Sequence, residues 1–479
     1  MLDDLIELMG AAAGRCEYAD VRRVITLRES LTVRNGRVQR LDTVETEGIG
    51  VRVRVRGAWG FAATSNAGRG AAQASLARAL ATAEAQPSVS RIVALAPAPP
   101  ADGAWTSSWD RDPFGIPVEA KLELLLDAEG ALRGDPRIAR SGADCLSERT
   151  IRAFASTEGA ACTQTSTECG AGLFAVAVSD GELQVRSYPA AHGGSVLAAG
   201  WEHIEALDLA GQAPRVADEA LALLDAPECR AGVTDVVLDG EQVALQLHES
   251  VGHALELDRI LGGEASYAGT SWVGPGDLGT LRYGSEAMNV TADATLPHGL
   301  GSFGWDDEGV AARRLPLVRD GVLRAALSSR ESAAEVGLEA SGGCARADGY
   351  ARQAIVRMTN VSLEPGEAGS LDELLADIDE GLYLETNRSW SIDDRRLNFQ
   401  FATEVGREIR GGRLGRLVRN PSYAGITPRF WVSLAAVAGP REWHLHGVSN
   451  CGKGEPGQLM RVSHGTAPAR FTGVQVGVA

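Results

Sequence analysis

The sequence predicts an α+β fold in two domains: an N-terminal α+β domain with an antiparallel sheet (residues 1–228) and a C-terminal, mainly β domain (residues 229–479). Residues 18–65 alternate apolar and polar side chains in short runs around an Asn-Gly hairpin signal. Helical segments occur singly between sets of strands rather than in regular strand–helix–strand units, which is typical of the α+β class. After Gly262 most of the chain consists of short strands separated by Gly, Asp and Asn turns.

In the N-terminal domain, the hairpin signal is Asn35-Gly36, and the stretch GVRVRVRG follows it. Because side chains alternate along a strand, we expect its valines to face a core and its arginines to face water or acidic partners. A proline-rich loop at 95–103 separates this sheet from the elements that follow. The predicted elements are helices over about 71–85, 118–132 and 215–224 and strands near 151–154, 173–178 and 182–188.

The C-terminal domain begins near residues 227–232 with the strand TDVVL. Asp239 follows it, and Gln242 comes three residues later, a pattern that indicates a helix N-cap with a capping-box partner. His248 and Glu249 therefore lie about two turns into a helix. A second helical stretch is predicted near 371–378.

Composition narrows the class of protein. The net charge of −17 disfavours direct binding of nucleic acid. The first residues carry acids where a secretion signal carries Lys or Arg, and no uncharged apolar run reaches the roughly 20 residues of a membrane span. Seven scattered cysteines without a CxxC pair argue against a disulfide framework. We therefore expect a cytoplasmic protein, not bound to membranes, whose cysteines are mostly buried thiols.

The stretch LQLHESVGHALELD contains the candidate metal ligands His248 and His253, with Glu249 beside the first. In the familiar zinc-peptidase pattern the two histidines stand four residues apart and the glutamate is the general base. Here the spacing is five, which places the rings roughly 140° apart on an ideal helix. Gly252 lowers the free-energy cost of a π-bulge or of ending the helix there, and either change would bring His253 back toward His248.

A catalytic zinc ion requires three protein ligands and one open position, so a third ligand has to come from elsewhere. An acid after a helix is usually solvated, and alternating strand histidines are more often exposed. A thiolate is a strong zinc ligand, and Lys453 could lower the pKa of the cysteine in SNCGKG. The candidates are Asp258, Glu256, His444, His446 and Cys451.

The segment from Gly447 to Gly454, GVSNCGKG, also matches the phosphate-binding loop G-x-x-x-x-G-K up to its last position. Gly454 stands where Ser or Thr would hold magnesium, and GEPGQ cannot start the helix that such loops require. The sequence thus favours a metal site over a nucleotide site, and measured zinc content against nucleotide affinity would separate the two.

Several motifs in the same order resemble the TldD/PmbA family, the so-called modulators of DNA gyrase. They are HESVGHALELD, GSFGWDDEGV with LVRDGVL, RMTNVSLEPGE and NCGK, with STEG and QVRSY in the first half. The resemblance implies a Zn²⁺ site formed by His248, His253 and Cys451, with Glu249 as the catalytic base. One departure from the family pattern is the insertion of residues 454–456 before Gly457-Gln458, at the rim of the expected site.

The resemblance also implies a function. TldD-like members are zinc metallopeptidases, whereas PmbA-like members lack the histidine motif, which this chain keeps. We therefore expect hydrolysis of unfolded or leader-bearing peptides, bound in extended form, by a homodimer or by a heterodimer with a PmbA-like chain. The alternatives are a non-hydrolytic peptide-modifying zinc enzyme and a catalytically silent PmbA-like partner subunit.

Overall fold

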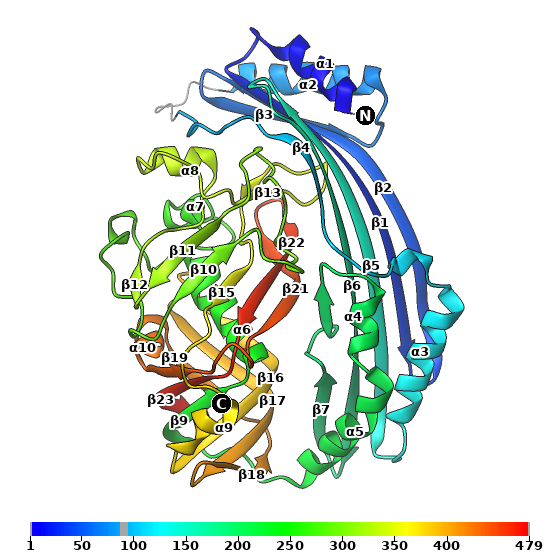
Figure 1. Ribbon diagram of the computed structural model, residues 1–479, viewed down its shortest axis with the longest axis vertical. Coiled ribbons are helices and arrows are strands. Elements are labelled where there is room, and N and C mark those ends of the chain that lie inside the picture. The colour runs from blue at the N-terminus through cyan, green and yellow to red at the C-terminus, as the bar shows by residue number, and fades with distance from the viewer. Residues whose placement is uncertain (1, 87–93, 478–479) are drawn as a thin grey trace.

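The computed structural model describes residues 2–86 and 94–477. A long, curved sheet extends along one side of the molecule, and the C-terminal half of the chain lies on its concave side (Figure 1). The fold is mixed α+β with mostly antiparallel sheets, as the sequence predicts.

The curved sheet has eight strands in the order β3-β2-β1-β5-β6-β4, with β7 and β8 also pairing with β6. The predicted hairpin turn lies between its first two strands, where Asn35 and Gly36 both have positive φ (47° and 74°), as a tight two-residue turn requires. The strands are β1 (Tyr18–Arg34), β2 (Arg37–Val55), β3 (Ala58–Thr64), β4 (Asp102–Thr106), β5 (Ile138–Ser156), β6 (Ala161–Ser179), β7 (Glu182–Tyr188) and β8 (Ser195–Leu197).

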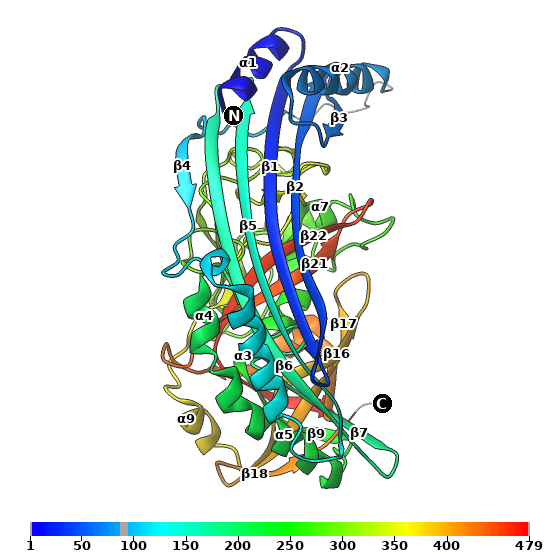
Figure 2. The same ribbon diagram turned by 90° about the vertical axis from the view of Figure 1, so that its right-hand side faces the viewer.

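Helices cover the convex face of this sheet, two at one end and two near the other (Figure 2). Val51 and Val53 pack against the first pair, whereas Leu31 and Cys145 pack against the second. The arginine between the two valines, Arg52, points to the concave side. The helices are α1 (Leu2–Ala12), α2 (Arg69–Ala85), α3 (Val118–Ala131) and α5 (Leu209–Asp225), with the short η1 (Pro113–Gly115) and α4 (Trp201–Ala206) beside them.

Arg52 contributes to the contact between the two halves of the chain. Its guanidinium lies 2.6 Å from Asp20 and 3.2 Å from Glu308 of the C-terminal half, so it is paired with acids, one of the two environments expected for these arginines. Arg461 likewise donates a hydrogen bond to Glu148 on β5 (2.8 Å). Ion pairs therefore connect the concave face of the sheet to the second half.

The second half is mainly β and contains a seven-stranded sheet, β16-β9-β23-β19-β17-β18 with β20 beside β23, a four-stranded sheet, β12-β11-β10-β15, and two hairpin-like pairs, β13-β14 and β21-β22. Its strands are β9 (Gly232–Leu238), β10 (Val290–Asp293), β11 (Arg314–Arg319), β12 (Val322–Leu323), β13 (Ala345–Arg346), β14 (Ile355–Val356), β15 (Val361–Leu363), β16 (Glu380–Ile392), β17 (Asn398–Arg410), β18 (Arg413–Val418), β19 (Ser422–Ile426), β20 (Leu434–Val437), β21 (His444–Lys453), β22 (Gln458–Thr466) and β23 (Ala469–Val476). Its helices are α6 (Gly240–Leu247), η2 (His248–Gly252), η3 (His253–Leu255), α7 (Leu257–Ile260), η4 (Pro275–Asp277), α8 (Arg330–Glu335), α9 (Leu371–Ala376) and α10 (Thr427–Val432).

Each sheet takes its strands from one half of the chain, the first from residues 18–197 and the others from residues 232–476. The division at residues 228 and 229 itself stays a prediction. All seven cysteines are free thiols, six of them buried, as expected from their scattered positions. Among the described residues, no helix has the length and apolar character needed to cross a bilayer.

Candidate metal centre

The helix that carries the histidines begins as the sequence predicts. The Asp239 carboxylate accepts a hydrogen bond from the backbone N–H of Gln242 (2.7 Å) and so caps α6. The reciprocal half of the predicted capping box is wrong, because the Gln242 amide donates to the Tyr423 hydroxyl (2.8 Å) and the Asp239 N–H donates to Leu384 O (3.0 Å). Both polar groups are satisfied by the core around the helix, which fixes its orientation.

At His248 the helix widens into a π-helical turn, one of the two local changes that the five-residue spacing and Gly252 predict. The backbone N–H of His253 donates to the carbonyl of His248, five residues earlier, and the two rings lie 4.8 Å apart. Gly252 also has a packing role, since a Cβ at this position would lie 2.1 Å from Met358 Sδ. The widened turn thus places both imidazoles on one side of the helix.

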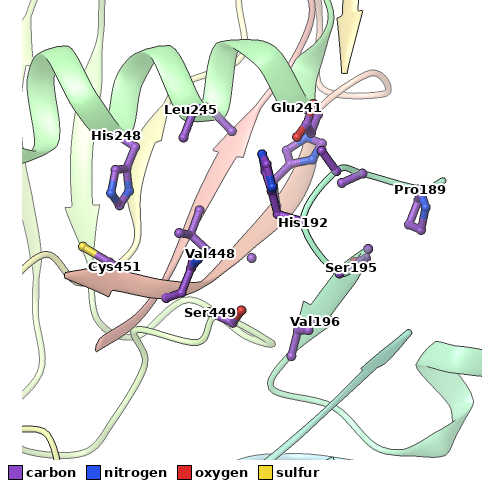
Figure 3. A pocket seen from close by; sticks show the side chains of 18 of the residues that line it. Pro189, His192, Ser195, Val196, Glu241, Leu245, His248, Val448, Ser449 and Cys451 are labelled. Carbon is purple, nitrogen blue, oxygen red and sulfur yellow. The ribbon is translucent and has the colours of Figure 1, made fainter. Parts of the chain in front are cut away.

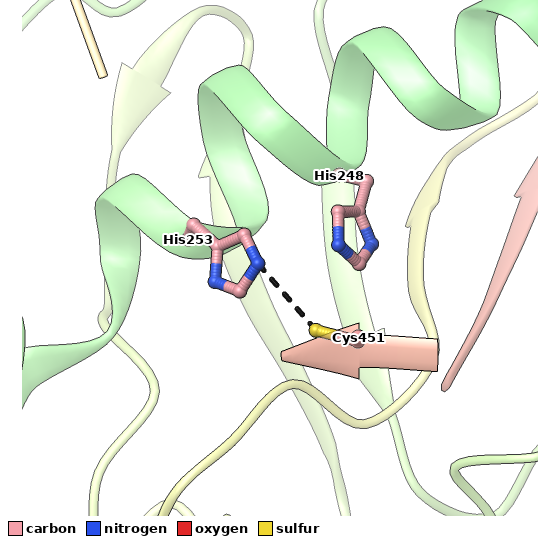
Figure 4. Close-up of side chains that lie close together, drawn as sticks. All are labelled: His248, His253 and Cys451. Carbon is pink, nitrogen blue, oxygen red and sulfur yellow. Dashed lines mark hydrogen bonds between the residues drawn. The ribbon is translucent and has the colours of Figure 1, made fainter. Parts of the chain in front are cut away.

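Cys451 completes a cluster with the two histidines, and all three residues are buried (Figure 4). Their ligand atoms lie within 4.8 Å of one another, and Cys451 Sγ is 3.4 Å from His253 Nε2. The cysteine lies on β21, where a break in the register with β22 falls between Val448 and Cys451. The structure therefore brings together the three residues that the family resemblance indicated as metal ligands.

Hydrogen bonds at the Nδ1 atoms orient the imidazoles of His248 and His253. His464 Nδ1 lies 2.6 Å from the Val361 carbonyl, which only accepts, so His464 Nε2 is free to accept from His248 Nδ1 (2.8 Å). Burial lowers the pKa of His248 and the pKa of His464 below the usual value, so these two rings are neutral. His253 Nδ1 in turn donates to Glu256 Oε2 (3.0 Å). His248 and His253 are thus left with unprotonated Nε2 atoms, the form that binds metals.

The thiol of Cys451 lies beside the His253 imidazole and the Arg357 guanidinium. Burial alone would raise its pKa, but His253 and the Arg357 guanidinium, whose Nη2 is 3.0 Å from Sγ, bring the pKa below the usual value. The suggestion that Lys453 does this is wrong. Its ammonium group donates instead to Asp258 (2.7 Å) and to the Val356 carbonyl (2.7 Å), behind the cluster.

The other candidate third ligands lie outside the cluster. Asp258 binds Lys453, and Glu256 holds His253 from behind; Lys453 and His253 keep the pKa of this glutamate well below its usual value although burial opposes them. His444 and His446 lie farther along β21. The phosphate-loop alternative is also contradicted, since residues 447–454 form β21 and a turn into β22 rather than a loop before a helix.

Glu249 lies beside the cluster and is 6% exposed. Arg396 Nη1 donates to its Oε2 atom (2.5 Å). The arginine has positive φ (60°) in the turn between β16 and β17, and its carbonyl accepts from the Thr427 hydroxyl (2.7 Å). No hydrogen bond from a described residue reaches the second carboxylate oxygen, Oε1, so that oxygen is free to accept a proton.

A cavity of about 1140 Å³ opens in front of the cluster. Leu245 and His248 from the helix, Val448 and Cys451 from β21, and the segment 189–196 from the N-terminal half surround it (Figure 3). Since the first sheet supplies further lining residues through β1, β2 and β5, the cavity belongs to both halves of the chain.

Comparison with known proteins identifies the family. Models of the PmbA/TldA metallopeptidase family match domain 1 at residues 19–86, the central domain at 111–224 and the C-terminal domain at 231–478. The chain belongs to the TldD/PmbA metallopeptidase family. A metalloprotease of Methanothermobacter thermautotrophicus is 32% identical over 471 residues, 97% of this chain and 96% of that protein. A zinc metalloprotease TldD homolog of Saccharolobus solfataricus is 31% identical over 199 residues, 41% of this chain and 42% of that protein.

Two solved structures share the fold of this chain. A Thermotoga maritima protein described as a modulator of a DNA gyrase has a TM-score of 0.79 at 16% identity, with 99% of both chains covered. TldE from Thermococcus kodakarensis has a TM-score of 0.74 at 14% identity, with 99% of this chain and 100% of that chain covered. At these identities the likeness concerns the fold alone.

Three residues beside the cluster were missed by reasoning from the sequence: His464, Arg357 and Arg396. Each contacts a ligand or the candidate base from a segment about 90 to 220 residues away in the chain. No local pattern indicated their roles, although Arg357 is the first residue of the motif RMTNVSLEPGE and all three are buried or half-buried polar residues.

Proposed function

We propose that this protein is a zinc-dependent metallopeptidase that hydrolyses unfolded or leader-bearing peptides bound in extended form. The observation that carries the proposal is the convergence of two oriented imidazoles and a low-pKa thiol beside a buried glutamate, at the wall of a large cavity. The names of the archaeal relatives, metalloprotease and zinc metalloprotease, agree with it.

The residues present fit zinc. Two imidazole nitrogens and a thiolate form a borderline-soft donor set that zinc accepts and that magnesium and calcium disfavour. The Nδ1–H group of each histidine already has an acceptor, so each Nε2 is free for a metal. When bound, zinc supplies Lewis acidity that activates a water molecule and the scissile carbonyl.

Glu249 supplies the proton transfer. Its Oε2 atom is held by Arg396, so Oε1 can take a proton from the attacking water and deliver it to the leaving amine nitrogen. The guanidinium fixes the carboxylate plane, and its positive charge stays in place after the carboxylate has been neutralised. Glu249 thus acts as base and then as acid without being a metal ligand.

The shape of the cavity favours extended substrates. In the described part of the chain β21 pairs with β22 alone, and residues 444–452 of β21 line the cavity. The backbone of β21 can hydrogen-bond an extended peptide as an additional strand, which a folded substrate cannot supply. Side-chain preference should then be loose near the metal. Dimerisation, with itself or with a PmbA-like chain, stays a prediction.

The decisive experiment is mass spectrometry of products after the zinc-loaded protein has been incubated with an unfolded peptide library. Hydrolysis gives fragments whose masses sum to the substrate plus one water, whereas another peptide modification changes the mass without cleavage. Glu249→Gln should retain zinc and lose cleavage, because the residue is a base and not a ligand. Turnover by this variant, or equally fast cleavage of a tightly folded protein, would contradict the proposal.

A further inference from the structure

A second cavity, of about 700 Å³, lies next to the catalytic one. Arg40, Leu146, Ser449 and Asn450 line both cavities, so the two are contiguous. Asn450 precedes the ligand Cys451, which lies opposite Met460 in the β21–β22 hairpin, and Met460 lines the second cavity. The second cavity therefore begins close to the metal cluster.

This cavity is positive although the protein as a whole carries a net charge of −17. Its charged lining among the described residues consists of five arginines, Arg28, Arg40, Arg152, Arg346 and Arg461, and three acids, Glu148, Glu168 and Asp348. Arg28 and Arg461 pair with the two glutamates, and Arg40 pairs with Asp42. The other two lining arginines are Arg152 and Arg346.

Within residues 2–86 and 94–477, no acid forms a salt bridge or hydrogen bond with either of these two guanidinium groups. Arg152 is placed by β5 on the concave face of the sheet; it forms no hydrogen bond or ion pair with any described residue, and its buried Nε lacks an acceptor. Arg346 is buried and donates only to carbonyl oxygens, those of Met358 (2.9 Å), Arg461 (2.8 Å) and Leu300 (3.3 Å).

Two acids act on Arg346, Asp307 and Glu168, and neither is free to balance these charges, since Glu168 pairs with Arg461. Arg152 and Arg346 both act on the carboxyl group of Asp307, but Asp307 pairs with Arg22 (3.4 Å) and accepts from the Ala347 N–H (2.7 Å). Burial and the neighbouring Arg152 lower the pKa of Arg346 to about 10, which still leaves it protonated at neutral pH. Two like charges held together in a partly desolvated cavity are unfavourable unless an anion joins them.

We propose that the second cavity binds a carboxylate of the peptide substrate through Arg152 and Arg346. A guanidinium group matches a carboxylate in a planar, two-bond geometry, and the pair is stronger inside a cavity than in water. A peptide that passes the metal cluster in extended form can continue past Ser449 and Asn450 into this cavity. The carboxylate is either the C-terminal one or that of an Asp or Glu side chain. This inference rests on the proposed peptidase function.

The test measures binding rather than turnover. Zinc-loaded Glu249→Gln is titrated with fluorescent, N-terminally labelled unfolded peptides that share one sequence without acids, as the free acid, as the C-terminal amide, and as the amide with one added Asp. The free acid, the Asp peptide or both should bind roughly tenfold or more tightly than the plain amide. Whichever of the two binds more tightly identifies the source of the carboxylate.

Variants then locate the effect. Arg152→Gln in the same background should remove the preference, whereas Arg28→Gln, a lining arginine already paired with Glu148, should leave it intact. Equal affinity of all three peptides would overturn the proposal even without a variant. So would an Arg152→Gln variant that weakens all three by the same factor. If no unfolded peptide bound at all, the proposed peptidase function would be refuted. That result differs from binding without preference, which would refute the carboxylate site alone.

Discussion

Cys451 distinguishes this candidate metal centre from zinc sites that close the ligand set with a carboxylate or a third histidine, and Cys451→Ser tests its role as a ligand. A four-ligand zinc site in a small peptide is worth about 10–16 kcal/mol, roughly 3 kcal/mol per ligand, so losing one ligand should weaken zinc binding about 100-fold. The effect should be no smaller here, because the serine hydroxyl cannot ionise beside His253 and Arg357 as the thiol can.

The assay is elemental analysis of zinc after dialysis against a graded chelator, with peptide cleavage measured on the same samples. Cys344→Ser is a matched control, because this thiol is 1% exposed, lies in the same half of the chain, and has a pKa that burial raises to about 12. Cys451→Ser should lose most of its zinc and activity, whereas Cys344→Ser should keep both. A full equivalent of zinc with normal turnover in Cys451→Ser would refute the ligand assignment.

Three further predictions concern two contacts around the centre and one buried carboxyl group away from it. Glu256→Gln removes the charge that holds His253 and should weaken zinc binding roughly 10- to 100-fold in the same chelator titration; unchanged affinity would mean that this contact does not tune the ligand. Arg396→Gln should lower kcat more than it changes KM and should leave the zinc content intact. Arg395→Gln, which replaces the exposed residue next to Arg396, should change neither kcat nor KM. A change confined to KM in Arg396→Gln would show that Arg396 binds substrate instead. Burial raises the pKa of the Glu404 carboxyl group to about 7. The contribution of this group to stability is therefore fully present below the pKa of the unfolded state and is lost as pH rises through about 7. Tm should fall from pH 5 to 8, and it should fall less steeply in Glu404→Gln.

Local patterns were sufficient to predict three local features of the fold, two of them in the helix of the site. The Asp239 cap, the π-helical turn at His248–Gly252 and the hairpin at Asn35-Gly36 each depend on residues within a few positions of one another, and all three are present. The second contact of the capping box failed because a long-range partner, Tyr423, competes for Gln242. Local preference therefore predicted the element, and tertiary contacts decided its side-chain partners.

The surroundings of the cluster could not be predicted in the same way. His464 contacts His248 across 216 positions of sequence, and Arg357 reaches Cys451 across 94. Such contacts depend on which segments lie side by side in the folded chain, and no local sequence pattern indicates that arrangement. The mistaken role for Lys453 has the same origin: it lies two residues from the cysteine in sequence, but its ammonium group pairs with the acids Glu256 and Asp258, which come from another segment of the chain.

The two halves of the chain contribute different parts of the chemistry. All three candidate ligands and Glu249 come from the C-terminal half, whereas the concave face of the first sheet supplies walls of both cavities. Ion pairs such as Arg461–Glu148 hold this face in place over the centre. Substitutions on the concave face, at Arg152 for example, should therefore change which peptides bind while leaving zinc affinity unchanged. Substitutions around His464 or Glu256 should do the reverse, so metal binding and substrate choice can vary independently in this architecture.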